Sequence, residues 1–438
     1  MSTWGEWLGL TNSAEDSDQN TSSNVAQTTE GESNTDKREG FESVIESSHG
    51  SPSLSSSHSA HTDFKQSAFA EYASMVGMDV VNAGFSLPIF CFEPSTELSR
   101  MSETFEFGYL MNTAASYKSD PVLKHAYVAA FVVSGYAHSI RLLKPFDSVP
   151  DETFQLEIPD WNMKYIAEHI SNDPSLSVGF CEGNGWSFTE DVQACAVYHG
   201  NSLEISNKGH RKLCFDGNEV LTWKFPKTTV NNLVLGSTYI EHHGELKIEN
   251  TNNGFKIEME FAQKGWFDYA KGGGVSGCVM DQDGNVKMKL KGSWMESLVG
   301  IYVGEDGQET GEEIELWNAG EHFVQDDVWK FTKFSCGYFD VTEDELKKYP
   351  PTDSRQRLDV RYLLKGKSQL AGEAKNWIEY QRKQRENEHK SDEKAVLSAR
   401  YFKQVDKDTQ FTEWDYIGDY WDKTQSIPDA EFEAMKLF

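Results

Sequence analysis

Apolar and polar residues alternate through the middle of the chain. Residues 255–261 place an apolar side chain at every second position with a charged side chain between, and residues 286–291 repeat this pattern. Alternation with a period of two is typical of a β-strand with one buried face and one wet face. Residues 185–295 therefore read as a series of strands, which predicts an antiparallel meander.

Turn signals separate these predicted strands. Asp216-Gly217, Asn253-Gly254 and Asp283-Gly284 are pairs that favour tight hairpin turns. A long meander has two exposed edges, and closure into a barrel hides them. Since a barrel of more than about eight strands leaves room for a ligand, we expect a large antiparallel barrel that encloses one.

Helical spacing appears on both sides of the predicted strands. Phe69, Tyr72 and Val76 recur at helical intervals, and Gly77 ends that pattern. Longer helical stretches are predicted over residues 96–115, 121–143 and 372–390. The predicted fold class is therefore mostly β with α, an α+β arrangement with helices before and after the barrel.

The overall charge is strongly acidic. The 438 residues include 70 Asp and Glu against 41 Lys and Arg, which gives a formal net charge of −29. This excess argues against binding to nucleic acid, because that binding depends on Lys and Arg at phosphates. It also argues against attraction of the whole surface to anionic membranes, so we expect any contact with a phosphate or a membrane to be local.

Residues 1–62 have a different composition from the rest of the chain. Ser, Thr, Asn and acidic residues dominate this segment, and Lys37 and Arg38 are its two basic residues. Such a segment buries too little apolar surface to offset the entropy of ordering, which predicts a disordered acidic tail. Its partner is unknown from sequence. Trp4 and Trp7 begin a short apolar face that is either a frayed terminus or a weak anchor.

The cysteines and the apolar runs indicate the cellular compartment in which the protein is expected. The six cysteines are widely spaced and form no C-x-x-C pair, so reduced thiols are expected and a zinc site is not. The most apolar run, residues 126–140, is shorter than the roughly 20 residues that a membrane span needs. No basic segment followed by an apolar one opens the chain. We expect a cytosolic protein.

Six short motifs follow one another in an order that resembles a known family. Residues 143–146 with 152–154 read L-K-P-F and E-T-F, and residues 200–205 read G-N-S-L-E-I. The other four are I-E-H with G-E at residues 240–245, G-W-F at 265–267, P-P-T-D-S-R at 350–355 and the aromatic run at 416–421. Over residues 66–438 the chain resembles the oxysterol-binding-protein-related family, in its ligand-binding domain.

The resemblance implies a domain layout. Residues 63–438 would form the lipid-binding domain, with a lid at 63–84, a helical section at 85–141, a barrel at 142–335 and a C-terminal subdomain at 336–438. Phe69, Tyr72 and Val76 would form the apolar face of the lid. The barrel would enclose a hydrophobic tunnel for a sterol or a phospholipid.

The resemblance also implies a function. The protein would carry one lipid between intracellular membranes as a monomer that touches them peripherally and transiently, without a cofactor and without catalysis. A lipid sensor or scaffold that does not transfer its ligand is the alternative, and an enzyme acting on lipid is a more distant one.

The family binds the phosphate of phosphatidylinositol 4-phosphate at a headgroup site, and this chain departs from that motif. The family sequence E-Q-V-S-H-H-P-P reads E-H-I-S-N-D-P-S at residues 168–175, and Asp147 replaces an asparagine. The residues that the resemblance assigns to the headgroup site are Lys144, Asn172, Asp173, Lys375, Glu379 and Lys383. Because an ionised Asp repels phosphate, we expect weakened exchange of this lipid.

The C-terminal part of this predicted site lies on one helix. A spacing of four residues places Lys375, Glu379 and Lys383 on the same helical face. Arg382 and Arg385 replace Lys383 if the helix is rotated. The alternative interpretation of this stretch is a solvated ladder of ion pairs without a ligand.

Other candidate chemistry is weak. His242 and His243 lie near acidic residues, but neighbours on a strand face opposite sides, so a shared metal ion is not expected. The chain has no G-x-S-x-G motif. Gly272, Gly273 and Gly274 lack the lysine of a phosphate-binding loop.

Overall fold

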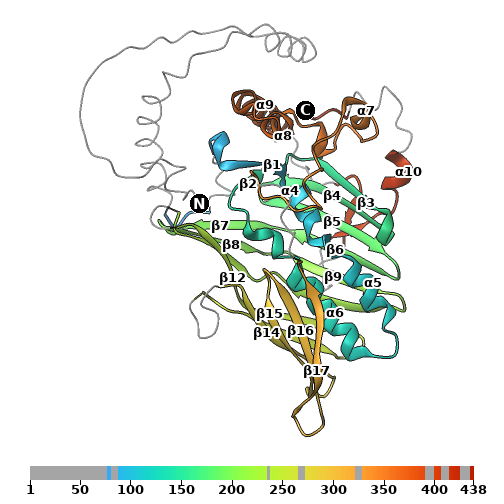
Figure 1. The fold of residues 1–438 in the computed structure, drawn as a ribbon. Helices are drawn as coiled ribbons and strands as arrows, with labels where there is room; N and C mark the ends of the chain where they lie inside the picture. The colour runs from blue at the N-terminus through green and yellow to red at the C-terminus, as the bar shows by residue number, and fades with distance from the viewer. Residues whose placement is uncertain are drawn as a thin grey trace, which may run out of the picture.

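The computed structural model describes most of the chain from residue 87 onward, together with a short segment before it (Figure 1). The described residues are 76–79, 87–233, 237–264, 272–320, 328–389, 399–405, 414–424 and 435–438. The predicted tail at 1–62 lies outside them, as do Phe69 and Tyr72 of the predicted lid. One large sheet organises the described part.

This sheet contains fifteen described strands, and every neighbouring pair is antiparallel. Its main path runs from β17 through β16, β15, β14, β13, β12, β10, β9, β6, β5 and β4 to β3. The strands are β3 (Thr153–Ile158), β4 (Met163–Asn172), β5 (Ser175–Gly183), β6 (Trp186–Val192), β7 (Ala194–Tyr198), β8 (Ser202–Asn207), β9 (His210–Phe215), β10 (Glu219–Lys224), β11 (Lys227–Asn231), β12 (Tyr239–Asn250), β13 (Lys256–Phe261), β14 (Gly274–Met280), β15 (Val286–Ser293), β16 (Ser297–Val303) and β17 (Glu309–Asn318). The predicted fold class, mostly β around a large antiparallel sheet, is confirmed.

The long strand β12 divides the sheet into two parts. Its first half pairs with β11, and its last residues pair with β10. Through β11 the sheet continues to β8 and β7, which lie off the main path. The strands β7, β8 and β11 therefore form a branch that the sequence pattern did not predict.

The alternating segments of the sequence behave as predicted. In β13 the side chains of Ile257, Met259 and Phe261 are buried, and those between them are exposed or partly exposed. Strand β15 buries Met288 and Leu290 in the same way. Gly217, Gly254 and Gly284 of the predicted turns all adopt positive φ, which glycine reaches without a steric penalty.

The helical section before the sheet is divided into shorter helices than predicted. It contains η1 (Ile89–Cys91), α4 (Glu97–Ser102), η2 (Glu103–Phe105), α5 (Tyr109–Ser116), α6 (Pro121–Ser134) and η3 (Ala137–Ile140). The side chain of Asp120 caps α6 by accepting a hydrogen bond from the Leu123 amide at 2.9 Å, and Pro121 occupies the first turn, where it fits. No described helix is both long and apolar enough to span a membrane.

One segment of this section is a strand. Residues Phe92–Thr96 form β1, which pairs in parallel with β2 (Lys144–Phe146). Pro94 disfavours a helix at this point, and Thr96 begins α4 as its N-cap. The predicted helical section therefore includes a strand beside the K-P-F motif.

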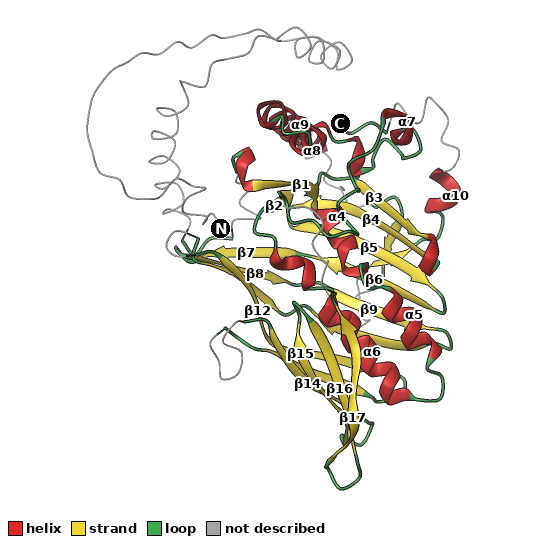
Figure 2. Cartoon of the chain, in the orientation of Figure 1, coloured by secondary structure: helices red, strands yellow, loops and turns green. Residues whose placement is uncertain are grey.

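The sheet wraps around these helices (Figures 1 and 2). Helix α4 contacts β3, β4 and β5, while α6 contacts β13 to β17 at the other end of the strand path. Phe105, Phe131 and Phe188 are fully buried where helices and sheet meet, with ring centroids 5.3–6.0 Å apart. In the described strands no ladder joins β3 to β17, so helices rather than hydrogen bonds bridge the two ends of the sheet.

The C-terminal segments pack on the β3 end of the molecule. They are α7 (Glu343–Leu346), η5 (Ser354–Gln356), α8 (Leu358–Leu364), α9 (Ser368–His389), β18 (Phe402–Gln404), β19 (Trp414–Tyr416) and α10 (Tyr420–Thr424). Tyr401, Phe402 and Trp414 share a core with Ile166 and Val178 of the sheet. The charged helix predicted at 372–390 is confirmed as α9.

Buried ion pairs connect the residues that follow the P-P-T-D-S-R segment to Glu152, which directly precedes β3. The Arg357 guanidinium lies 2.9 Å from Glu152 and 2.7 Å from Asp359, and all three side chains are buried. The same guanidinium donates to the Asp147 carbonyl oxygen at 2.8 Å. Removing it leaves two buried carboxylates without their counter-ion.

We predict that Arg357→Ala lowers the free energy of unfolding by about 3–5 kcal/mol, because an unpaired buried charge carries that penalty. Denaturant titration of the purified variant measures the loss. Lys289→Ala is the matched control, since its pair with Glu309 is roughly half exposed at both side chains and should contribute at most about 1 kcal/mol. Equal losses in the two variants would contradict the assignment.

Candidate functional site

The predicted headgroup residues come from three elements, of which β2 and α9 meet beside Phe92. Lys144 lies on β2, Asn172 ends β4, and Lys375 and Glu379 lie on α9. The ammonium groups of Lys144 and Lys375 lie 5.4 and 5.2 Å from the centroid of the Phe92 ring. Two cations close to one ring place the K-P-F motif next to the C-terminal helix, the neighbourhood that the family resemblance implies.

Each of these lysines has a carboxylate partner. Lys144 forms an ion pair with Asp147, and the Lys375 ammonium lies 2.5 Å from the Glu379 carboxylate. Lys375 is only 4% exposed, so Glu379 compensates a charge that is largely removed from water. The positive charge of the site is therefore already paired within the protein.

A second carboxylate lies near Lys144. Glu97 of α4 is partly exposed and accepts a hydrogen bond from the Ser148 amide at 3.3 Å. Partial burial, followed by repulsion from Asp147, raises the pKa of Glu97 to about 7. Both effects disfavour further negative charge at this end of the site.

A chain of hydrogen bonds runs from the sheet to α9 through Asn172. The Ser177 hydroxyl lies 2.8 Å from Nδ1 of His169, and Nε2 of His169 lies 3.0 Å from Oδ1 of Asn172. The Asn172 Nδ2 group donates to Glu386 at 3.1 Å. Arg382 lies 3.4 Å from the same carboxylate oxygen.

Protonation states follow from this chain. Burial lowers the pKa of His169 to about 4, so the ring is neutral at physiological pH. Since the amide oxygen of Asn172 can only accept, Nε2 of His169 carries the proton and Nδ1 accepts from Ser177. The donor of Asn172 consequently points at α9.

Two predicted residues lie apart from these contacts. Asp173 and Lys383 are both exposed, and the Asp173 backbone amide donates to the Ser171 hydroxyl at 3.2 Å. The cation paired with Glu386, the carboxylate that Asn172 contacts, is Arg382, the alternative that a rotated helix implies. Sequence spacing alone did not distinguish Arg382 from Lys383, and it offered no reason to select Glu386.

Of the predicted lid, Val76 lies within the described residues, at the edge of β7. Its side chain is 54% exposed. The following amide, that of Gly77, donates to the Tyr198 carbonyl oxygen at 2.7 Å, and the Asp79 carboxylate accepts from the Ala196 amide at 3.2 Å. The lid itself stays a prediction, and its described residues, 76–79, are anchored to the branch of the sheet formed by β7, β8 and β11.

Polar side chains of β6, β9 and β12 are also buried, close to Thr104 and Tyr136 of the helical section. The Tyr136 ring lies 4.6 Å from that of His242, and Arg211 forms an ion pair with Glu190 at 2.9 Å. Among the described residues, Nε2 of His242 and Oε1 of Glu190 have no hydrogen-bond partner. Burial lowers the pKa of His242 to about 3, which keeps it neutral.

The two neighbouring histidines point to different partners. His242 contacts the Thr228 hydroxyl at 2.8 Å, and His243 contacts that of Thr229 at 2.9 Å. In the described part of the chain, no three His, Cys, Asp or Glu side chains are grouped as metal ligands.

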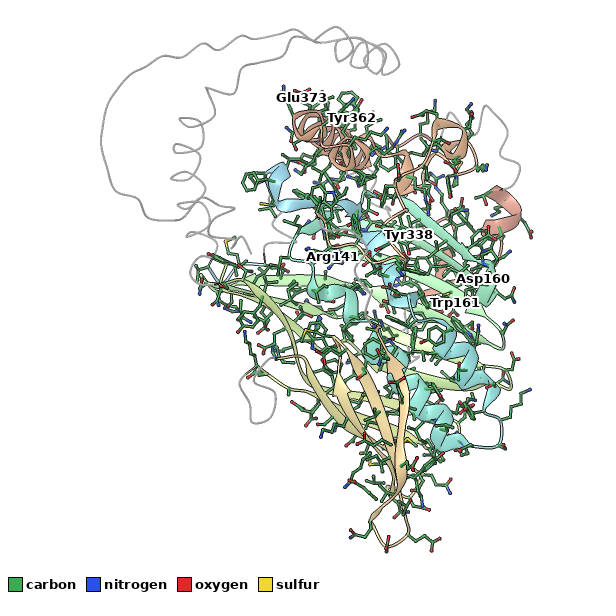
Figure 3. All side chains as sticks on the ribbon, in the orientation of Figure 1. Arg141, Asp160, Trp161, Tyr338, Tyr362 and Glu373 are labelled. Atoms are coloured by element: carbon green, nitrogen blue, oxygen red, sulfur yellow. The ribbon has the colours of Figure 1, made fainter. Side chains whose placement is uncertain are left out.

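Arg141 lies inside the molecule close to the helical section (Figure 3). Its guanidinium lies 3.1 Å from Glu93 and 2.7 Å from Glu103, and all three side chains are buried. This network connects β1 and η2 to the segment that leads into β2. It therefore fixes the position of Lys144 relative to the helices.

The motif residue Glu168 holds the C-terminal segment. Its buried carboxylate accepts hydrogen bonds from the amides of Arg400 and Tyr401 at 2.7 and 3.0 Å. Burial raises the pKa of Glu168 from an ordinary 4.5 to about 7, although these two hydrogen bonds favour the charged form. Glu168 is thus a positioning residue beside the site.

Comparison with known proteins gives a consistent result. A family model described as Oxysterol-binding protein matches residues 67–425. Oxysterol-binding protein-related protein 1B of Arabidopsis thaliana is 30% identical over 354 residues, which cover 80% of this chain and 70% of that protein. Oxysterol-binding protein 11 of Dictyostelium discoideum is 28% identical, with 85% and 65% covered. Other relatives are longer, and the chain spans 49% of oxysterol-binding protein-related protein 2B of A. thaliana.

Two solved structures have a similar fold. The Osh1 ORD domain in complex with cholesterol has a TM-score of 0.73 and 26% identity, with 84% of this chain and 88% of that chain covered. The Osh3 ORD of Saccharomyces cerevisiae in complex with PI(4)P has a TM-score of 0.68 and 26% identity, with 89% and 96% covered. The similarity therefore extends over nearly the whole described fold.

The raised pKa of Glu168 predicts a pH dependence of stability. The folded chain holds more protons at this carboxyl than the unfolded chain between about pH 4.5 and 7. The stability it contributes is therefore complete below that range and is lost as the pH rises through about 7. Relative to Glu168→Gln, wild type should lose stability between about pH 5 and about pH 8.

Thermal unfolding of both proteins across this pH range measures the effect. Glu245→Gln is the control, because the Glu245 side chain is exposed on β12. A difference between wild type and Glu168→Gln that stays constant with pH would contradict the assignment.

Proposed function

The chain belongs to the oxysterol-binding protein family, and on that premise we propose that it encloses one sterol or phospholipid and carries it between intracellular membranes. The observation that carries this proposal is the match to two lipid-bound structures over 84% and 89% of the chain. One of those proteins holds cholesterol and the other holds PI(4)P. Either ligand class is compatible with a sheet that wraps around an apolar interior.

The interior supports a ligand with one polar end. Apolar side chains of the sheet and helices supply the contact surface, and burying a lipid of sterol size at about 25 cal/mol per Å² provides useful affinity. Nε2 of His242 and Oε1 of Glu190 are buried without partners among the described residues. A ligand hydroxyl would satisfy such groups, because a buried polar atom left unpaired is costly.

The headgroup end supports weakened recognition of phosphatidylinositol 4-phosphate. Lys144 and Lys375 are already paired with carboxylates, and Asn172 donates to a third carboxylate. A phosphate entering this site would compete with those internal partners. The proposed work is extraction and delivery of a lipid rather than bond chemistry.

The remaining features of the proposal concern how the protein meets membranes. We infer a cytosolic monomer that contacts membranes transiently, with a lid at 63–84 whose described residues include the exposed Val76. The acidic segment 1–62 would remain outside the lipid-binding domain, which occupies residues 63–438.

Lipid transfer is the first test. Purified protein should move labelled sterol or phospholipid from donor to acceptor liposomes faster than the spontaneous rate, and native mass spectrometry should detect one lipid per chain. Binding without movement would favour a sensor or scaffold, and a change in lipid mass would indicate an enzyme. Failure to take up any lipid in a broad liposome screen would rule the proposal out.

The second test concerns the altered motif. Asn172→His combined with Asp173→His should increase extraction of phosphatidylinositol 4-phosphate by about ten-fold, because a repulsive charge is lost and a donor is gained. Adding Lys144→Ala or Lys375→Ala should cancel that gain. Sterol extraction by the same variants is the control for folding. If wild type already extracts the phosphoinositide as well as the double variant, the charge argument is wrong.

A further inference from the structure

Helix α9 carries a stripe of alternating charge, and the last residue of the stripe contacts the end of β4. Lys375, Glu379, Arg382 and Glu386 are spaced by four, three and four residues, which aligns them on one face of a helix with 3.6 residues per turn. Lys375 pairs with Glu379, and Arg382 pairs with Glu386. The stripe is formally neutral, although a lysine and an arginine lie on it.

Glu386 also contacts the end of β4 in the large sheet. Its carboxylate accepts from the Asn172 amide at 3.1 Å. The oxygen of the same amide lies 3.0 Å from Nε2 of His169. Nδ1 of His169 in turn lies 2.8 Å from the Ser177 hydroxyl. The donor of Asn172 is therefore held in one orientation, and the group that it meets is an anion.

We propose that Glu386 is an internal anion that takes the place of a headgroup phosphate and makes this site select against lipids that end in a phosphomonoester. The proposal rests on the proposed function, since it assumes that the polar end of the lipid reaches this site. It concerns a specificity-determining residue that lies outside the family motif quoted for the headgroup site.

The contacts explain the selection. A phosphate at this position needs the Asn172 donor and the Arg382 guanidinium, and Glu386 uses both. If the phosphate entered beside the carboxylate, two like charges would lie within a few ångströms of each other in partly buried surroundings. A ligand whose polar end is an uncharged hydroxyl meets no such repulsion.

Exposure makes the residue accessible and replaceable. The side chain of Glu386 is 34% exposed and that of Arg382 is 20% exposed, so an entering headgroup can reach them from solvent. Their separation of 3.4 Å is long for an ion pair, and a partly exposed pair of this kind stabilises a fold weakly. Neutralising Glu386 should therefore change binding more than folding.

The test compares Glu386→Gln with Glu373→Gln. Both changes remove one negative charge from α9, and the side-chain amide introduced by Glu386→Gln would keep an oxygen for the Asn172 donor. Glu373 is exposed and contacts Gln369 of the same helix, on the part of α9 that Figure 3 labels. Thirteen residues of helix place it roughly 20 Å from Glu386. It therefore controls for the change in net charge.

We expect Glu386→Gln to increase extraction of phosphatidylinositol 4-phosphate from liposomes by about ten-fold. Calorimetry should show a similar increase in affinity for soluble inositol 1,4-bisphosphate. Glu373→Gln should leave both unchanged, and the gain of Glu386→Gln should shrink as salt is raised, because partly exposed charges are screened.

The outcomes separate this proposal from the proposed function. If all proteins extract sterol but Glu386→Gln and Glu373→Gln bind the phosphorylated headgroup equally, the internal anion is refuted while lipid carriage stands. If no protein takes up any lipid, lipid carriage fails, and calorimetry with the bisphosphate still tests Glu386. An equal gain for inorganic phosphate would indicate a general anion site and overturn the assignment to a lipid headgroup.

Thermal unfolding of the variants shows whether a change in binding results from loss of the folded state. If Glu386→Gln unfolds early, Glu386→Asp retains the charge on a shorter side chain and should bind the bisphosphate no better than wild type. A gain in Glu386→Asp would show that loss of the Asn172 contact, and not loss of the charge, explains the effect, and would overturn the proposal.

Discussion

A buried charge needs a partner, and this constraint determines both the fold and the candidate site. Arg141 lies between Glu93 and Glu103 where β1 and η2 approach the segment before β2. Arg357 likewise lies between Glu152 and Asp359, where the C-terminal segment meets the start of β3. Because removing one ion from such a network leaves the others uncompensated, these junctions have little freedom, and the positions of Lys144 and α9 follow from them.

The same constraint limits what the site can bind. Lys375 is nearly as buried as Arg357, so it needs an acidic partner, and Glu379 of the same helix provides one. A count of basic residues therefore overstates the attraction for an anion. The charge that a ligand experiences is what remains after the protein's own carboxylates are paired.

Sequence periodicity predicted some elements and missed others for physical reasons. In strands β13 and β15, apolar and polar residues alternate because one face of each strand is exposed to water. Strand β4 is buried along almost its whole length. Helix α4 contacts it, and Ile166 and Ile170 pack against the C-terminal segment. Because both faces of β4 are covered, its sequence does not alternate between apolar and polar residues. Strand β17 is mostly exposed and acidic at the edge of the path, so few of its residues are apolar enough to indicate a strand.

The site shows a further limit of reasoning from a motif. Comparing residues 168–175 with a family pattern directs attention to Asp173, where a charge has changed, but that side chain is exposed. The carboxylate that meets the Asn172 donor comes from Glu386, 214 residues later in the chain. Helical spacing aligns Glu386 with Lys375, but it does not show that this is the face of α9 that meets the sheet. What packs against a helix selects among its faces, and no local pattern contains that information.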